Sequence, residues 1–331
     1  MEKVILGLSG GVDSAVAASL LRSRGFDVHG VYLDIGLGGD TDARVVAGSL
    51  GIPLEICDIR AELDDKVCTR FASSYLAGKT PNPCMLCNPN VKFPTLLRMA
   101  DKLGGQYVAT GHYARCEDSR LFKGKPSNDQ SYMLSRLTPQ QLKRCLFPLG
   151  GMEKVQVRAL AEKLDLPVAH KPDSMEICFI PDGDYAAFIA SRGEVPPEGN
   201  FVDERGQVLG RHRGIHHYTL GQRKRLGIAL GKRIFVSAID SLNNTVTLSD
   251  DDVLSVNRAE AEEANWLISP PDGGFDADVR VRHSKLSYPA HITPLGTGFT
   301  IEFSAPVRAP TPGQAAVGYI GDEVVCSGWI I

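Results

Sequence analysis

The sequence predicts an α/β protein whose first half holds a parallel sheet and whose second half is β-rich. Two observations predict this fold class. In residues 1–182, short apolar runs alternate with helical stretches, an order typical of βαβ units in a Rossmann-like domain. After Asp182 the apolar runs are short and closely spaced, with glycine and proline turns between them, which is typical of a small barrel or sandwich. The 331 residues exceed what one core usually holds, so we expect several domains.

Each element of the first domain, residues 1–182, is a patterned run with a turn signal at its end. Lys3–Leu8 is rich in strand-forming residues and stops at a serine and two glycines. The next stretch places apolar residues at helical spacing and ends at Gly25. By the same reasoning we expect strands at 27–33, 54–59 and 107–110, and helices at 13–24, 41–50, 61–76, 91–103 and 153–164.

Two further domains are expected in the rest of the chain. Residues 191–200 are rich in proline, glycine and polar residues, as linkers are. The central domain, residues 183–255, is small and β-rich, and Asn243-Asn244 between two of its runs predicts a hairpin. The C-terminal domain, residues 256–331, has closely spaced β-rich runs, so we expect a β-barrel-like fold there.

The composition is that of a soluble globular protein. Hydrophobic residues make up 43% and charged residues 23% of the chain, and no apolar run reaches the roughly 18 residues of a membrane-spanning helix. The N-terminus is typical of a strand and not of a signal peptide, so we expect a cytoplasmic protein with no membrane partner. The eight cysteines would then be reduced, and buried, catalytic or metal-binding roles are expected for them.

The charge of the chain is distributed unevenly. The net charge of −3 argues weakly against nucleic-acid binding. However, residues 205–233 contain eight basic residues, three histidines and no acid. This stretch is either a solvated loop or a local phosphate-binding face, because phosphate contacts depend on local charge density.

The segment Ser9–Ser14, with sequence SGGVDS, directly follows the first strand and opens the first helix. Its two glycines let the backbone turn tightly and approach a ligand closely. The start of the helix offers free N–H groups and the positive end of its dipole, so we expect an anion here. The segment is neither a Walker loop nor G-x-G-x-x-G, and instead matches the PP-loop of ATP pyrophosphatases.

Two cysteine segments also indicate chemistry. Thr80–Asn88, TPNPCMLCN, has two prolines, which predict a non-helical loop, and a Cys-x-x-Cys pair. Two close thiols could bind a metal, form a redox disulfide or supply a nucleophile. The segment 173–180, DSMEICFI, adds Cys178 as the third member of a candidate site.

The combination of motifs identifies a family. SGGVDS, TPNPCMLCN, ATGHY, NDQSYML, DSMEICFI and YTLGQRKRLGI occur in this order. The chain thereby closely resembles the bacterial tRNA-uridine 2-sulfurtransferases, or tRNA 2-thiouridylases, over essentially its whole length. The resemblance implies a PP-loop ATP-binding catalytic domain at 1–182 and a tRNA-binding central domain at 183–255.

The activity that this resemblance implies is ATP-dependent 2-thiolation of the wobble uridine, position 34, of tRNA. ATP with Mg²⁺ would adenylate the 2-carbonyl of a flipped-out uracil, and sulfur transfer would follow, so that pyrophosphate and AMP are released. Cys178 would carry sulfur from a donor or relay protein as a persulfide, and Cys87 would be the paired nucleophile. The implied ATP-binding residues are Gly7, Leu8, Ser9, Gly10, Gly11, Val12, Asp13, Ser14, Leu33 and Gly111.

The resemblance also implies which residues meet tRNA. Near the target base we expect Asn82, Pro83, Cys84 and His112. Other positions that match tRNA contacts of the family are Asn128, Asp129, Gln130, Arg282, His283 and Gln314. From the basic stretch, Arg223, Lys224 and Arg225 are expected to contact phosphates.

One departure from the family leaves two mechanisms open. This chain has Cys84 where the best-known family pattern has an aspartate. Thiolates from Cys84, Cys87 and Cys178 would suit a four-iron four-sulfur cluster with one iron open to sulfide. The third cysteine favours the cluster, and a persulfide relay is the alternative.

A second class of function also stays open. A PP-loop ligase or synthetase acting on a small molecule would explain SGGVDS, but neither the two cysteine segments nor the basic stretch. The remaining cysteines, Cys57, Cys68, Cys116, Cys145 and Cys326, receive no catalytic role.

Overall fold

The structure, a computed structural model, describes residues 1–173 and 176–331. The chain forms two compact units. The first unit comprises 1–67, 84–179 and 322–325, and the second comprises 68–83, 180–321 and 326–331. Ser174 and Met175 of the DSMEICFI segment lie outside the described residues. The domain boundaries expected at 182/183 and 255/256 stay predictions.

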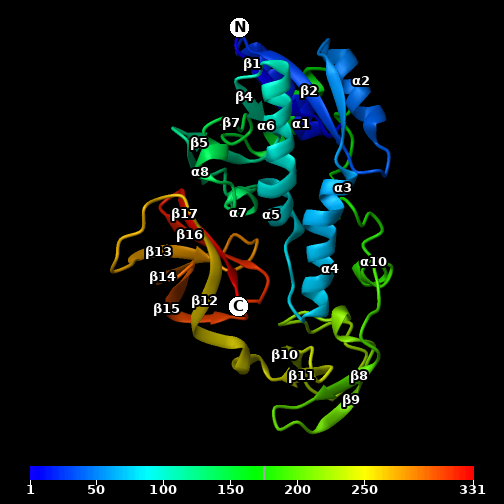
Figure 1. Cartoon of the computed structure of the whole chain (residues 1–331), viewed down its shortest axis with the longest axis vertical. Helices are drawn as coiled ribbons and strands as arrows, with labels where there is room; N and C mark the ends of the chain where they lie inside the picture. Colours follow the sequence, from blue (N-terminus) through cyan, green and yellow to red (C-terminus); the bar gives the residue numbers. More distant parts are fainter. Residues whose placement is uncertain (174–175) are drawn as a thin grey trace. The chain divides into compact units, whose positions relative to one another are not determined.

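A five-stranded parallel sheet organises the first unit (Figure 1). Its order is β3-β2-β1-β4-β7, and all four neighbouring pairs are parallel. The strands are β1 (Lys3–Gly7), β2 (Asp27–Asp34), β3 (Leu54–Asp58), β4 (Tyr107–Ala109) and β7 (Cys145–Leu146). The parallel sheet predicted for the N-terminal region is therefore confirmed.

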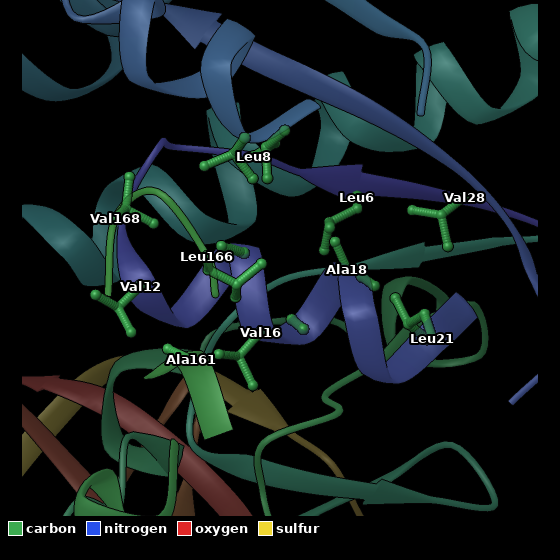
Figure 2. Close-up of a cluster of buried hydrophobic side chains, with 14 of the residues drawn as sticks. Leu6, Leu8, Val12, Val16, Ala18, Leu21, Val28, Ala161, Leu166 and Val168 are labelled. Carbon is green, nitrogen blue, oxygen red and sulfur yellow. The ribbon is translucent and has the colours of Figure 1, made fainter. Parts of the chain in front are cut away.

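Helices cover both faces of this sheet. Alternate residues of the β1 segment therefore pack against helices on opposite faces. Leu6 and Leu8 pack with Val16 of α1 (Val12–Ser23) and Ala161 of α9 (Lys154–Lys163), as Figure 2 shows. Gly7 faces the opposite side, where a Cβ would lie 3.4 Å from Leu96 of α6 (Phe93–Leu103). Burial on both faces explains why these strands are continuous apolar runs.

The other elements of the first unit are short. They are α2 (Asp40–Leu50), α3 (Arg60–Leu63), α5 (Pro83–Cys87), α7 (Ser131–Leu134) and α8 (Pro139–Leu142), with the antiparallel pair β5 (Ala114–Glu117) and β6 (Arg120–Lys123). Glu323, at the start of β17 (Glu323–Ile330), pairs with Phe122 of β6. The described residues include the π-helical turns η1 (Asp64–Cys68) and η2 (Asn88–Lys92). The helix expected at 61–76 is thus interrupted by η1 and resumes as α4 (Thr69–Leu76).

The prediction of a non-helical loop at Thr80–Asn88 is wrong. Helix α5 starts at Pro83 and includes both Cys84 and Cys87. Proline is accepted at the first position of a helix, because its missing N–H would have no helical partner there. The two prolines therefore mark a helix start.

Two β structures dominate the second unit. A four-stranded sheet has the order β10-β11-β8-β9, with strands β8 (Gly199–Val202), β9 (Val208–His212), β10 (Phe235–Asp240) and β11 (Thr245–Ser249). The hairpin predicted at Asn243-Asn244 joins β10 to β11 and is confirmed. Helix α10 (Tyr185–Ala190) and the 3₁₀ turns η3 (Ile215–His217) and η4 (Asp251–Leu254) complete this region.

The C-terminal strands form a closed antiparallel barrel, which confirms the predicted fold class. The order is β12-β15-β14-β13-β16-β17, and β17 pairs back with β12. The strands before β17 are β12 (Ser255–Trp266), β13 (Phe275–Arg280), β14 (Tyr288–Leu295), β15 (Gly298–Arg308) and β16 (Ala315–Ile320). Among the described residues, no helix is long and apolar enough to cross a membrane.

Candidate functional site

The predicted ATP-binding residues lie where parallel α/β sheets bind ligands. The chain runs outward from β1 to β2 and β3, and then returns to β4 on the other side of β1. Ligands bind beyond the carboxyl ends of the strands at such a switch point. Gly7 ends β1, Leu33 is the penultimate residue of β2, and Gly111 follows β4 by two residues. The topology therefore gathers these residues at one edge of the sheet.

Residues 7–14, called here the nucleotide loop, present backbone N–H groups to that edge. Gly10 has φ +72°, and a Cβ there would lie 2.7 Å from the backbone nitrogen of Ala43, so only glycine fits. Helix α1 has no side-chain cap at its N-terminus. The hydroxyls of Ser9 and Ser14 lie 3.2 Å apart. Uncapped N–H groups, two hydroxyls and the helix dipole together suit phosphate oxygens.

Cationic side chains surround the nucleotide loop. The ammonium of Lys154 contacts both carboxylate oxygens of Asp13 at 2.8 Å, and that of Lys171 donates to the Gly10 carbonyl at 3.3 Å. The sequence reasoning missed both lysines. Neither lysine belongs to a contiguous motif, so only their contacts in the structure identify them.

The three candidate sulfur-chemistry cysteines belong to the first unit. Cys84 and Cys178 are exposed, and Cys87 is half-buried. Although Cys178 as a residue is exposed, its thiol is largely desolvated, and this desolvation, with secondly the neighbouring Cys87 and Cys84, raises the pKa of Cys178 to about 11. Burial also raises the pKa of Cys87. Both thiols are therefore protonated at neutral pH until a neighbouring charge or base activates them.

The described residues include no group of three or more cysteine, histidine, aspartate or glutamate side chains that could hold a metal ion. A cluster held by Cys84, Cys87 and Cys178 would need the three thiolates gathered around the metal, and it stays a prediction beside the persulfide route.

His112 lies in a largely apolar setting. Its Nδ1 is 2.7 Å from the Thr110 hydroxyl, and the ring stacks on Phe93 with centroids 6.2 Å apart. Burial, and secondly the positive charge of Lys92, lower the pKa of His112 well below its ordinary value. His112 is therefore neutral at physiological pH and can exchange hydrogen bonds with an uncharged base.

Lys92 is a third lysine that the sequence did not indicate. Its positive charge partly offsets the desolvation that raises the pKa of Cys87 and of Cys178. Lys92 ends the π-helical turn η2, and such turns often occur at functional sites. The sequence gives no signal for a π-turn, so its position could not have been predicted.

The predicted tRNA contacts at 128–130 have structural partners. Asp129 accepts from the N–H of Gly124 at 2.8 Å and from Ser131, and Gln130 accepts from the N–H of Tyr113 at 3.0 Å. With its amide oriented to satisfy its neighbours, Asn128 accepts from the backbone N–H of Lys154. These side chains fix the local backbone, whatever further contacts they make.

Other predicted tRNA contacts belong to the second unit. Asn82 and Pro83 are buried. Gln314 donates to the carbonyl of Thr80 at 2.7 Å, which ties this segment to the loop before β16. Arg282 donates to the carbonyls of residues 308 and 309 at 2.8 Å, and His283 is exposed.

The basic stretch is a surface of the second unit. Its cations are all exposed; they are Arg205, Arg211, Arg213, Arg223, Lys224, Arg225, Lys232 and Arg233. Lys232 pairs with Asp250 at 2.8 Å and Arg211 lies 3.9 Å from Glu198. Within the described residues, Arg223, Lys224 and Arg225 have no acidic partner. We call these three residues the basic patch.

Comparison with known proteins gives matches along the whole chain. Three family models match, described as a tRNA methyl transferase HUP domain (residues 2–182), a tRNA methyl transferase PRC-barrel domain (186–250) and an aminomethyltransferase beta-barrel domain (256–330).

Curated relatives carry a more specific name. A tRNA-specific 2-thiouridylase MnmA of Syntrophotalea carbinolica is 44% identical over 99% of this chain and 98% of that protein. The one of Heliobacterium modesticaldum is 43% identical over 100% of this chain and 92% of that protein.

A solved 4-thiouridine synthetase–RNA complex with bound ATP resembles 52% of this chain and 43% of that chain, with 19% identity and a TM-score of 0.36. A likeness this low carries no inference about the site. The identity to curated relatives over nearly full lengths shows that the chain belongs to the tRNA-specific 2-thiouridylase family.

Proposed function

We propose that the protein is a tRNA-uridine 2-sulfurtransferase that uses ATP to thiolate the wobble uridine, position 34, of tRNA. The observation that carries the proposal is that one compact unit holds both a glycine-rich loop that suits phosphate and the two cysteines Cys87 and Cys178. Activation by ATP and transfer of sulfur need these two parts within reach of one base.

The first step is activation of the base. The uracil 2-carbonyl oxygen attacks the α-phosphorus of ATP, a P–O bond forms, and pyrophosphate leaves. The N–H groups of residues 10–14 and the hydroxyls of Ser9 and Ser14 bind the phosphates, and Leu33 and Gly111 border the nucleotide. Mg²⁺ would enter with ATP as part of this substrate.

The second step is sulfur transfer. The terminal sulfur of a Cys178 persulfide attacks C2 of the activated uracil, and AMP leaves. The Cys87 thiolate then attacks Sγ of Cys178, the S–S bond to the transferred sulfur breaks, and a Cys87–Cys178 disulfide remains. Two thiols are oxidised as the sulfane sulfur is reduced, and an external thiol reductant restores them. A sulfur donor or relay protein would reload Cys178.

Recognition of tRNA is assigned to both units. The base must leave the anticodon stack, because its 2-carbonyl is otherwise out of reach. Cys84 and the neutral His112 of the first unit are proposed to contact this base. Asn82 and Pro83 of the second unit are proposed as further tRNA contacts. Phosphates and neighbouring nucleotides are proposed to contact Asn128, Asp129, Gln130, Arg282, His283, Gln314 and the basic patch. Since tRNA and ATP are cytoplasmic substrates, we place the reaction in the cytoplasm.

The experiment that tests this function measures pyrophosphate release and thiolated product with unmodified tRNA, ATP and a persulfide donor. We expect both to require a tRNA with uridine at position 34, and a matched tRNA with cytidine there to give neither. Release that is equally fast without tRNA would favour a small-molecule ligase. A methylated product would instead favour the activity that the family models are named for.

A further inference from the structure

Residues 219–225, called here the patch loop, carry the three cations of the basic patch. The loop lies between Tyr218 and Leu226, which are both buried in one apolar core of the second unit. The three cations between these two residues are exposed. The loop therefore presents its charges to water while both of its ends are fixed in the core.

Strand β10 holds the middle of the patch loop. The N–H of Gly221 donates to the carbonyl of Val236 at 2.7 Å. The N–H of Val236 in turn donates to the carbonyl of Gln222 at 3.0 Å. This pair of backbone bonds attaches the loop to the sheet directly before the first cation.

The side chain of Gln222 braces the part of the loop that carries the charges. Its Oε1 accepts from the N–H of Thr219 at 3.0 Å, and its Nε2 donates to the carbonyl of Lys224 at 3.0 Å. Its own N–H donates to the carbonyl of Thr219 at 3.0 Å. One uncharged side chain therefore bonds to the backbone on both sides of Arg223.

Arg225 adopts a backbone conformation that needs such support. Its φ is +61°, in the left-handed region where the Cβ of any residue other than glycine crowds the following carbonyl. A residue stays in this region only when the surrounding structure holds it there. The bond from Gln222 to the carbonyl of Lys224 fixes the peptide group that leads into this residue.

A loop that is already ordered binds phosphate at a lower cost than a loop that must be ordered first. Backbone and side chains that become ordered only on binding lose conformational entropy, and this loss reduces the affinity. Gln222 carries no charge, so its effect on affinity includes no counterion release. Its contribution should therefore be the same at every salt concentration, unlike that of the cations.

We propose that Gln222 is a positioning residue for tRNA, whose amide orders the patch loop before the RNA binds. It acts through the backbone of the loop, which places the three cations for contact with phosphates. This inference rests on the proposed function, and it assigns part of the affinity for tRNA to an uncharged residue.

The first test needs no tRNA and follows trypsin cleavage after Arg223, Lys224 and Arg225 by peptide mass spectrometry. Gln222→Met is a variant of similar size that cannot form these hydrogen bonds. We expect cleavage there to be about fivefold faster than in wild type, because proteases cut segments that open locally. Cleavage after Arg205, in the turn between β8 and β9, is the internal reference and should not change. Equal cleavage of the patch loop in the two proteins overturns the proposal.

The second test measures binding of unmodified tRNA with uridine at position 34 over a salt series. Gln222→Met should lower the affinity about fivefold at every salt concentration and leave the slope of log affinity against log salt unchanged. Lys224→Ala should instead flatten that slope by about one unit. In the thiolation assay, the KM of Gln222→Met for tRNA should rise while kcat stays the same. A flattened slope in Gln222→Met, or an affinity equal to wild type, overturns the positioning role.

Two further variants serve as controls. Gln222→Asn has an amide too short to reach both backbone groups, so it should behave as Gln222→Met does. Gln207→Met changes an exposed glutamine of the same unit and should behave as wild type. Thermal midpoints show whether each variant is folded. Failure of the wild-type chain to bind tRNA contradicts the proposed function instead, and the cleavage assay still tests the brace.

Discussion

Gly111 lies directly against the backbone of Asp13: a Cβ at position 111 would be 2.9 Å from the carbonyl carbon of Asp13 and 3.0 Å from the nitrogen of Ser14. The loop after β4 therefore supports the nucleotide loop after β1 by backbone packing. No side chain fits between them, which gives a physical reason for glycine at this position.

Gly111→Ala should weaken ATP binding more than it weakens folding. The added methyl group must push the nucleotide loop away from its N–H geometry, so we expect the KM for ATP to rise about tenfold or more, a loss of about 1.4 kcal/mol. Gly151→Ala is the matched control, because nothing lies within 4 Å of a Cβ at that position. Equal KM values for the two variants would show that the Gly111 contact does not shape the loop.

The reactivity of Cys178 should depend steeply on pH. Its pKa of about 11 means that the thiolate fraction, and hence the alkylation rate, keeps rising about tenfold per pH unit from pH 7.5 to 9.5. Lys92→Met should slow alkylation at pH 8, because the charge of Lys92 lowers this pKa. Lys102→Met, which changes an exposed lysine on α6, is the control. A plateau near pH 8.5 would mean that the thiol is not desolvated.

Much of the fold follows from local sequence patterns. The succession from β1 to β3 was predictable, because each strand is an apolar run and Gly25 and Gly51 follow the helices. Strand β12 was not predicted. Its sequence, SVNRAEAEEANW, is rich in alanine and glutamate, which favour helix. Pairing with β15 and β17 makes it a strand, so tertiary contacts override local preference.

The candidate site likewise has residues that the sequence predicts and residues that only the structure identifies. The residues of the nucleotide loop and both cysteine segments could be identified, because each is a contiguous motif. Lys154 could not, because its role depends on contact with Asp13, which is 141 positions away in sequence. Helix α5 was missed since prolines indicate both loops and helix starts, and only the structure distinguishes these.

The basic patch should contribute counterion release to tRNA binding. Replacing Arg223, Lys224 and Arg225 together with alanine should flatten the slope of log affinity against log salt by roughly 2–3 units, about one for each lost phosphate contact. Arg44→Ala, which removes a cation already paired with Asp40, should leave the slope unchanged. Filter binding over a salt series measures both, and an unaltered slope in the triple variant would make the patch a solvated turn.

The stability of the chain should fall as the pH decreases from 7.5 to 5.5. Burial lowers the pKa of several histidines, namely His29, His112, His212, His216 and His217. The unfolded chain then binds protons first as the pH falls through about 6.5, which favours unfolding. Thermal midpoints should drop over this range, and His112→Gln should reduce the drop. The exposed His170, changed to Gln, should not alter it.

Cys84 separates the two routes of sulfur transfer. In the persulfide route only Cys87 and Cys178 react, so replacing either with serine should abolish 2-thiouridine formation. Cys84 is exposed and belongs to no metal-holding group among the described residues. We therefore expect Cys84→Ser to keep thiolation within about threefold of wild type, as surface substitutions usually do.

The same variants test the iron–sulfur cluster directly when the protein is purified without oxygen. Serine is a poorer iron ligand than a thiolate, so a cluster held by three cysteines would lose its iron and its visible absorbance in Cys84→Ser, together with activity. Cys84→Asp, whose carboxylate can still bind iron, would then keep part of both. Iron analysis and activity assays on the same preparations decide between the routes. Wild-type protein that binds no iron but thiolates tRNA from a persulfide donor supports the persulfide route, and parallel loss of iron and thiolation in Cys84→Ser overturns it.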